Sequence, residues 1–262
     1  MLRFFLTLSL CLISLGLLAQ NRTYTYLIYH KLSPGLTVQD ALPVEREWRA
    51  VNQAAVDEGN MIGWYMMAKQ MTSNPNPAEY DYVTVIVSPS MNIKGGSPAA
   101  MAKLYGDSVQ TRMASLNARD RATAPVVKME VWETAGAYAF SPDFTPEKAP
   151  VVVFNYMKPY DPKAPWLDIM DAMKAGATNR LKDGSLSGWA FSKLILPNGS
   201  EKGYSLLVAQ IGTNPAAIAN QLVFTGESAK AHTQSRQTFD IVRQEVFRVM
   251  EFTNRPGTTA GK

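Results

Sequence analysis

The stretch Gly59-Asn60-Met61-Ile62-Gly63-Trp64 decides the interpretation of this 262-residue chain, because a second version follows as Gly184-Ser185-Leu186-Ser187-Gly188-Trp189. Further matches keep the same order: 27–31 with 154–158, Tyr80 with Tyr204, 106–108 with 226–228, and 126–132 with 241–247. The offset shrinks from 127 residues (154 − 27) to 115 residues (241 − 126), as small gaps would produce. Ordered self-similarity of this kind is typical of duplicated units. The sequence therefore predicts two tandem copies of one structural unit.

Each copy shows the same succession of predicted elements. A strand rich in aromatic and β-branched residues comes first, followed by a helix with one apolar face, a hairpin, a second helix and a closing strand. In the first copy these elements are 24–31, 43–58, 64–70 with 80–87, 98–117 and 126–133; in the second they are 151–158, 165–183, 189–196 with 204–211, 215–235 and 241–252. The order β-α-β-β-α-β is that of the ferredoxin-like split βαβ unit.

The N-terminus has the pattern of a secretory signal. Arg3 precedes an almost continuous apolar run, Phe4 to Leu18, and Ala19 is a suitable last residue before cleavage. A membrane anchor is the alternative, but the run is at the short limit for spanning a bilayer. We expect a secreted or periplasmic protein with no membrane contact after cleavage.

The predicted organisation has five parts. They are a signal peptide over 1–19, a first repeat over 22–135, a connector over 136–150, a second repeat over 151–253 and a flexible tail over 254–262. The connector is rich in proline, which favours a stiff spacer. The sequence does not fix the oligomeric state.

Composition and motifs exclude several classes of function. Hydrophobic residues make up 46% of the chain and charged residues 18%, so the protein is globular. The net charge of +4 is not gathered in a Lys/Arg run, which argues against nucleic-acid binding. The only cysteine, Cys11, lies in the predicted signal, so the mature chain has no thiol chemistry. Serine-hydrolase, zinc-protease, P-loop and dinucleotide motifs are absent.

Element order, duplication and the repeated Gly-Trp and Tyr-x-Lys motifs resemble the dimeric α+β-barrel superfamily in a fused form, over about residues 22–253. The resemblance implies an α+β fold in which two tandem ferredoxin-like repeats pack sheet-to-sheet as a fused α+β barrel. That superfamily includes cofactor-independent monooxygenases, haem enzymes, isomerase-like enzymes and proteins without a known role, so the fold does not select an activity. The chain has only His30 and His232, neither with metal-ligand spacing, and we expect no cofactor.

Alternation along the strands predicts which side chains meet between the sheets. In the first and last strands, a Tyr, a Lys and a Glu of each copy share the face opposite the helices, and Lys128 and Arg243 belong to that face too. The face beneath the helices holds Val127, Met129 and Val131 in the first copy and Val242, Gln244 and Val246 in the second. The candidate cleft-lining residues are Tyr29, Lys31, Trp64, Glu130, Trp132, Tyr156, Lys158, Trp189, Glu245 and Phe247. They form either a ligand cleft or a salt-bridge network that only satisfies buried groups. The two tryptophans are equally consistent with core positions.

These patterns leave the biochemical role of this exported protein unknown. They predict that it binds a small amphipathic molecule or a partner in the inter-sheet cleft. One alternative is a cofactor-independent monooxygenase-like enzyme acting on an aromatic or polyketide-like substrate. Another is haem binding. Whether the protein is an enzyme stays open.

Overall fold

Alternating and apolar segments form nine strands in the computed structural model, which describes residues 22–135, 138–161, 166–199, 202–219, 233 and 237–254. The strands are β1 (Arg22–His30), β2 (Gly63–Thr72), β3 (Tyr82–Ser88), β4 (Val126–Ala135), β5 (Tyr138–Phe140), β6 (Val151–Pro159), β7 (Gly188–Leu196), β8 (Leu206–Gly212) and β9 (Phe239–Phe252). The helices are α2 (Val38–Asp57), α3 (Pro98–Tyr105), α4 (Val109–Thr123), α5 (Trp166–Lys182) and α6 (Pro215–Ala219), with a 3-10 turn at Gly106–Ser108.

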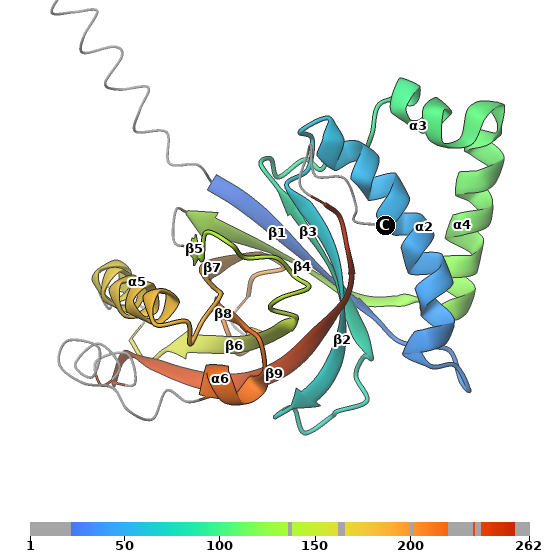
Figure 1. The fold of residues 1–262 in the computed structure, drawn as a ribbon. Coiled ribbons are helices and arrows are strands. Elements are labelled where there is room, and N and C mark those ends of the chain that lie inside the picture. Colours follow the sequence, from blue (N-terminus) through green and yellow to red (C-terminus); the bar gives the residue numbers. More distant parts are fainter. Residues whose placement is uncertain are drawn as a thin grey trace, which may run out of the picture.

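Eight of these strands close into an antiparallel barrel (Figure 1). The strand order is β4-β1-β3-β2-β9-β6-β8-β7, and pairing of β4 with β7 completes the circle. Both halves have the ferredoxin-like order, β4-β1-β3-β2 and β9-β6-β8-β7. The halves meet at two seams, β2–β9 and β4–β7, so the two sheets join edge to edge and leave fewer free edges.

The first helix begins earlier than the sequence pattern predicts. We expected it to start at Pro43, but α2 starts at Val38 and Pro43 lies inside it. Thr37 is the cap, and its backbone N–H donates to Asp40 Oδ2 at 2.8 Å. The helix ends before Gly59, whose φ of +72° suits glycine. The cap therefore sets the helix start, and the proline does not.

The described residues form four apolar clusters, and three of them lie against the barrel wall. One fills the interior and includes Leu27, Phe154 and Phe247. A second lies between the wall and α2, and a third lies under α5 and α6. In Figure 1, α2 and α4 lie on one side of the barrel and α5 on another. The interior is thus a separate compartment from the helix-covered layers.

One face expected beneath the helices is largely exposed. Val127 and Met129 on β4 are 50% and 47% exposed, and only Val131 is buried. Val242 on β9 is 40% exposed. The expectation was wrong because barrel closure places β4 and β9 at the seams, whereas α2 packs chiefly over β2.

Other sequence predictions concern the connector, the second helix of the second repeat and the two ends of the chain. Residues 138–140, in the predicted connector, form β5 and pair with β7. The helix expected over 215–235 is described only as α6, and the rest, including His232, lies outside the described residues. The predicted signal and most of the predicted tail also lie outside them. In the part of the chain that the structure describes, no helix is both long and apolar enough to span a membrane.

Candidate functional site

Glu130 is the centre of a buried polar cluster inside the barrel. It projects from β4 and has no exposed surface. Its carboxylate accepts hydrogen bonds from Tyr29 at 2.8 Å and Tyr204 at 2.6 Å, and Trp132 Nε1 lies 3.3 Å away. Lys202 Nζ makes an ion pair with it at 2.5 Å. A buried carboxylate with this many donors is held in its charged form.

Glu245 has a matching environment on β9, in the other half of the barrel. It is also fully buried and accepts from Tyr80, from Thr72 at 2.9 Å and from Arg243 Nη2 at 2.8 Å. Each buried carboxylate therefore has at least one tyrosine hydroxyl and a cation as partners, which compensates for its removal from water.

A tyrosine pair joins the two halves of the cluster. The hydroxyls of Tyr29 and Tyr156 lie 3.0 Å apart in the barrel interior. We call the whole set the tyrosine–carboxylate network; its members are Tyr29, Tyr80, Tyr156, Tyr204, Glu130, Glu245, Lys128, Lys202, Arg243 and Glu79. Tyr29 and Tyr156 come from corresponding strands of the two halves, β1 and β6, and Glu130 and Glu245 come from β4 and β9. The network is therefore roughly two-fold.

The network runs from the interior to one end of the barrel. Tyr80 and Tyr204 come from the connections that precede β3 and β8. The side chains of Glu79, Lys128 and Arg243 are 31%, 21% and 12% exposed, so they reach solvent while the carboxylates they contact do not. The stretches 73–81 and 202–205 therefore bring the network to the surface at this end.

Burial and charge together fix the protonation states. Burial alone would raise the pKa of Glu130, but Lys128 and the hydrogen bonds from Lys202 and Tyr204 outweigh it and lower that pKa. Burial first, and neighbouring tyrosines and carboxylates second, hold the pKa of Tyr29 well above its usual value. The tyrosines are hydrogen-bond donors at neutral pH, not bases.

One donor of the network has no partner. Arg243 Nε is buried and makes no hydrogen bond among the described residues. The guanidinium lies 5.6 Å from the ring centroids of both Tyr80 and Tyr156. The hydrogen bonds and ion pairs within the network do not explain this unpaired charged donor beside two aromatic rings.

Six of the ten candidate residues come together in the interior. These are Tyr29, Glu130, Trp132, Tyr156, Glu245 and Phe247, all with at most 1% exposure. Trp64 and Trp189 do not line this space: the first packs against the α2 side and the second beneath α5 and α6. Their placement in a cleft was wrong because both lie on the outer face of the barrel wall.

Lys31 and Lys158 also lie apart from the carboxylates. Lys31 pairs with Asp81 at 3.2 Å, and Lys158 is exposed. In both halves the register with the closing strand shifts directly after the tyrosine, at Tyr29/His30 and at Tyr156/Met157. The extra residue lies in the closing strand each time, Val127 in β4 and Val242 in β9, so the alternation along β1 and β6 is unbroken. The lysines lie apart because they are at strand ends: Lys31 follows the last residue of β1, and Lys158 is the last but one residue of β6.

The cations of the network are Lys128, Arg243 and Lys202. Alternation placed Lys128 and Arg243 on the same face as Glu130 and Glu245, although neither was among the ten candidates. Tyr80 and Tyr204 had a signal as well, since they match each other in the repeat. Lys202 lies in the connection before β8, where no pattern predicts side-chain direction.

The position of His30 does not suit a haem ligand in the barrel interior. His30 Nδ1 lies 3.0 Å from the Ala124 carbonyl and Nε2 3.0 Å from Thr84 Oγ1, in the layer under α2 and α4. It therefore does not point into the barrel interior, where buried side chains already pack against each other.

No known family profile and no curated protein sequence matches the chain. Solved structures do resemble it. A Fusobacterium nucleatum protein provisionally called a monooxygenase has 9% identity and a TM-score of 0.53, over 92% of this chain and 97% of its own. A Lactobacillus acidophilus protein with the same provisional description has 9% identity and a TM-score of 0.49, over 90% and 97%. A haem-binding protein from Thermus thermophilus has 11% identity and a TM-score of 0.46, over 87% and 91%.

These similarities bear on the fold alone. The Fusobacterium nucleatum structure supports the α+β-barrel fold that the resemblance implied. At such low identity none of the three transfers an activity.

Proposed function

We propose that the protein binds a small amphipathic molecule at the end of the barrel where the tyrosine–carboxylate network reaches solvent. The ligand would have a flat apolar part and an oxygen that accepts a hydrogen bond. The unpaired Arg243 Nε is the observation that carries this proposal.

A buried donor without a partner costs about 1–3 kcal/mol, and more when it is charged. Native structures seldom keep such a group without a reason. Arg243 is fixed by Glu79 at 2.9 Å and Glu245 at 2.8 Å, so its free N–H is held in one direction. An acceptor oxygen from a ligand would satisfy it. The rings of Tyr80 and Tyr156 lie beside it but are 0% and 1% exposed, so the flat part of the ligand would have to displace the side chains that cover them.

A cofactor-independent oxygenase is less well supported by the same residues. Such an enzyme has to take a proton from its substrate, which requires an available base. The two buried carboxylates already accept from tyrosines and cations, and burial raises the pKa of Tyr156 well above its usual value. We therefore favour binding over catalysis, with a small molecule ahead of a protein partner.

Two further parts of the proposal are that the protein is exported and that its two halves arose by duplication. We infer that residues 1–19 are a cleaved leader, so the ligand would be met outside the cytoplasm. The matched stretches and the same strand order in both halves support an origin by duplication.

The test uses 8-anilino-1-naphthalenesulfonate, an amphipathic aromatic anion, as a fluorescent probe of the purified chain. Wild type should bind it with saturation, and Arg243→Lys should bind about tenfold more weakly because lysine lacks the Nε donor. Arg248→Lys is the matched control, since Arg248 is exposed on the same strand.

Far-UV circular dichroism and melting curves must show that each variant is folded, because this dye also binds loosened proteins. Saturable binding that is equally strong in Arg243→Lys would overturn the proposal, as would no binding to wild type. Oxygen uptake with 1,8-dihydroxyanthrone provides a second arm. Uptake above that of buffer, abolished in Arg243→Lys, would show an oxygenase instead.

A further inference from the structure

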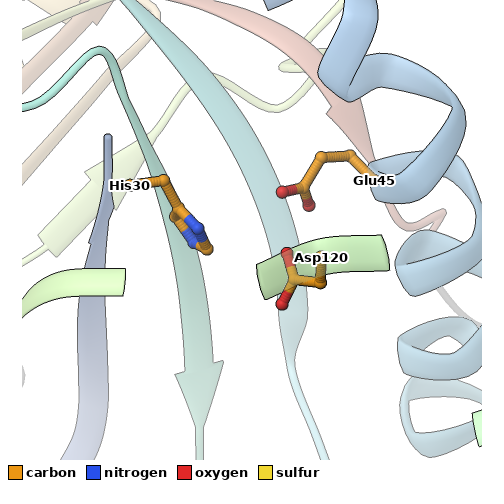
Figure 2. A group of neighbouring side chains, drawn as sticks. All are labelled: His30, Glu45 and Asp120. Carbon is orange, nitrogen blue, oxygen red and sulfur yellow. The ribbon is translucent and has the colours of Figure 1, made fainter. Parts of the chain in front are cut away.

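A second polar cluster lies outside the barrel interior. His30 at the end of β1, Glu45 on α2 and Asp120 on α4 each offer a ligand atom, and these atoms all lie within 4.8 Å of one another (Figure 2). Figure 2 shows both carboxylates turned towards the imidazole. His30 is 4% exposed and Glu45 is 1% exposed. The cluster is therefore enclosed between the barrel wall and two helices.

Its two carboxylates are incompletely satisfied. Glu45 Oε1 accepts from the Tyr82 hydroxyl at 2.6 Å, but Glu45 Oε2 has no hydrogen-bond partner. Asp120 Oδ1 is also buried without a partner. Among the described residues no lysine or arginine makes an ion pair with either carboxylate. Glu45 is buried and Asp120 is half-buried, and an orphan carboxylate oxygen without an ion pair is costly in both, which points to a missing positive charge.

The imidazole is prepared to act as a ligand. His30 Nδ1 lies 3.0 Å from the Ala124 carbonyl, which can only accept, so Nδ1 carries the proton. The lone pair therefore lies on Nε2, where it accepts from Thr84 Oγ1 at 3.0 Å. A backbone carbonyl on the other ring nitrogen is the usual support of a metal-binding histidine. Tyr82 stacks on the ring at 4.6 Å between centroids and fixes its orientation.

We propose that His30, Glu45 and Asp120 form a divalent metal site, with Zn²⁺ as the ion that suits one imidazole nitrogen and two carboxylate oxygens. Zinc takes these donors at about 2.0–2.2 Å, which leaves them about 3.3 Å apart. Small rotations of the Glu45 and Asp120 side chains bring the donors together. Thr84 or a water is available for the fourth position.

The pKa shifts of the two carboxyls agree with this assignment. Burial raises the pKa of Glu45 to about 8, against the hydrogen bond from Tyr82, which lowers it. Burial likewise raises the pKa of Asp120. A bound cation would favour the charged form of both groups. The ion would also clamp α2 and α4 to β1, a structural role independent of the ligand proposed at the other site.

The experiment is isothermal titration of Zn²⁺ into the full chain after treatment with EDTA and transfer to metal-free buffer. Wild type should bind one equivalent. Glu45→Gln and Asp120→Asn should each bind at least tenfold more weakly. Glu47→Gln is the matched control on the same helix, since Glu47 pairs with Arg119 away from the cluster, and it should bind as wild type does.

Melting curves supply a readout that does not depend on the heat of binding. At a hundredfold excess over Kd, Zn²⁺ should raise the Tm of wild type and Glu47→Gln by about 5 °C or more. Asp120→Asn, whose carboxyl is less buried, serves if Glu45→Gln fails to fold. Absence of Zn²⁺ binding to wild type would overturn the proposal, as would binding that both ligand variants retain. A more stable Glu45→Gln without Zn²⁺ binding to wild type would show two acids that share a proton.

Discussion

Replacing Glu130 with alanine tests whether the tyrosine–carboxylate network stabilises the barrel. The change removes the acceptor for Tyr29, Tyr204 and Trp132 Nε1, and it leaves Lys202 without its counter-ion. Removing one partner of a buried ion pair typically costs about 3–5 kcal/mol.

The structure places this variant near the lower end of that range. Lys202 and Lys128 are 18% and 21% exposed, so water can partly solvate them once the carboxylate is gone. Tyr29 also keeps its contact with Tyr156. We therefore expect a loss of about 3 kcal/mol in the free energy of unfolding. For a chain of this size, that corresponds to a Tm lower by about 6–12 °C.

Urea unfolding and thermal melts of Glu130→Ala and wild type measure the loss. Glu79→Ala is the control, because Glu79 belongs to the same network but is 31% exposed. Partly exposed ion pairs contribute less than buried ones, so this variant should lose about 1 kcal/mol, clearly less than Glu130→Ala. If Glu130→Ala costs no more than Glu79→Ala, the network does not hold the barrel together and its interior is effectively solvated.

Three further outcomes are expected. The folded-state pKa of Glu130 lies below its ordinary value of 4.5, so the stabilisation by its carboxylate is present above pH 4.5 and is lost as the pH falls further. Glu130→Gln should therefore flatten the acidic part of a curve of unfolding free energy against pH. An unchanged curve would contradict the assignment. Tyr29→Phe removes the hydroxyl that contacts Glu130 and Tyr156, and it should lower the free energy of unfolding by about 1–2 kcal/mol. Tyr160→Phe, at a 64% exposed position, should leave the free energy of unfolding almost unchanged. Equal losses in the two variants would count against the network. Mature protein recovered from its host should begin near Gln20 by mass spectrometry, and an intact Met1 on exported material would refute cleavage.

The site shows where strand alternation succeeds and where it fails. The alternation of side chains along a strand was enough to place Glu130 and Glu245 in the barrel interior, because both lie in the middle of long strands whose pairing is regular there. It did not bring Lys31 and Lys158 to these carboxylates, because both lie at strand ends: Lys31 follows the last residue of β1, and Lys158 is the last but one residue of β6. Alternation assigns a face to a side chain but does not show where the strand leaves the barrel.

The sequence by itself predicted the order of the strands, which is the same in both halves of the barrel. That order is encoded locally, in alternation, helical periodicity and the ordered matches around Trp64 and Trp189. Only the tertiary structure decided which groups meet. Closure through β2–β9 and β4–β7 brought Tyr29 to Tyr156 and placed Lys202 on Glu130. The packing of α2 and α4 on the wall brought Glu45 and Asp120 to His30. Such contacts join residues far apart in the chain, and their geometry depends on strand register and barrel closure, which single-sequence periodicity does not encode.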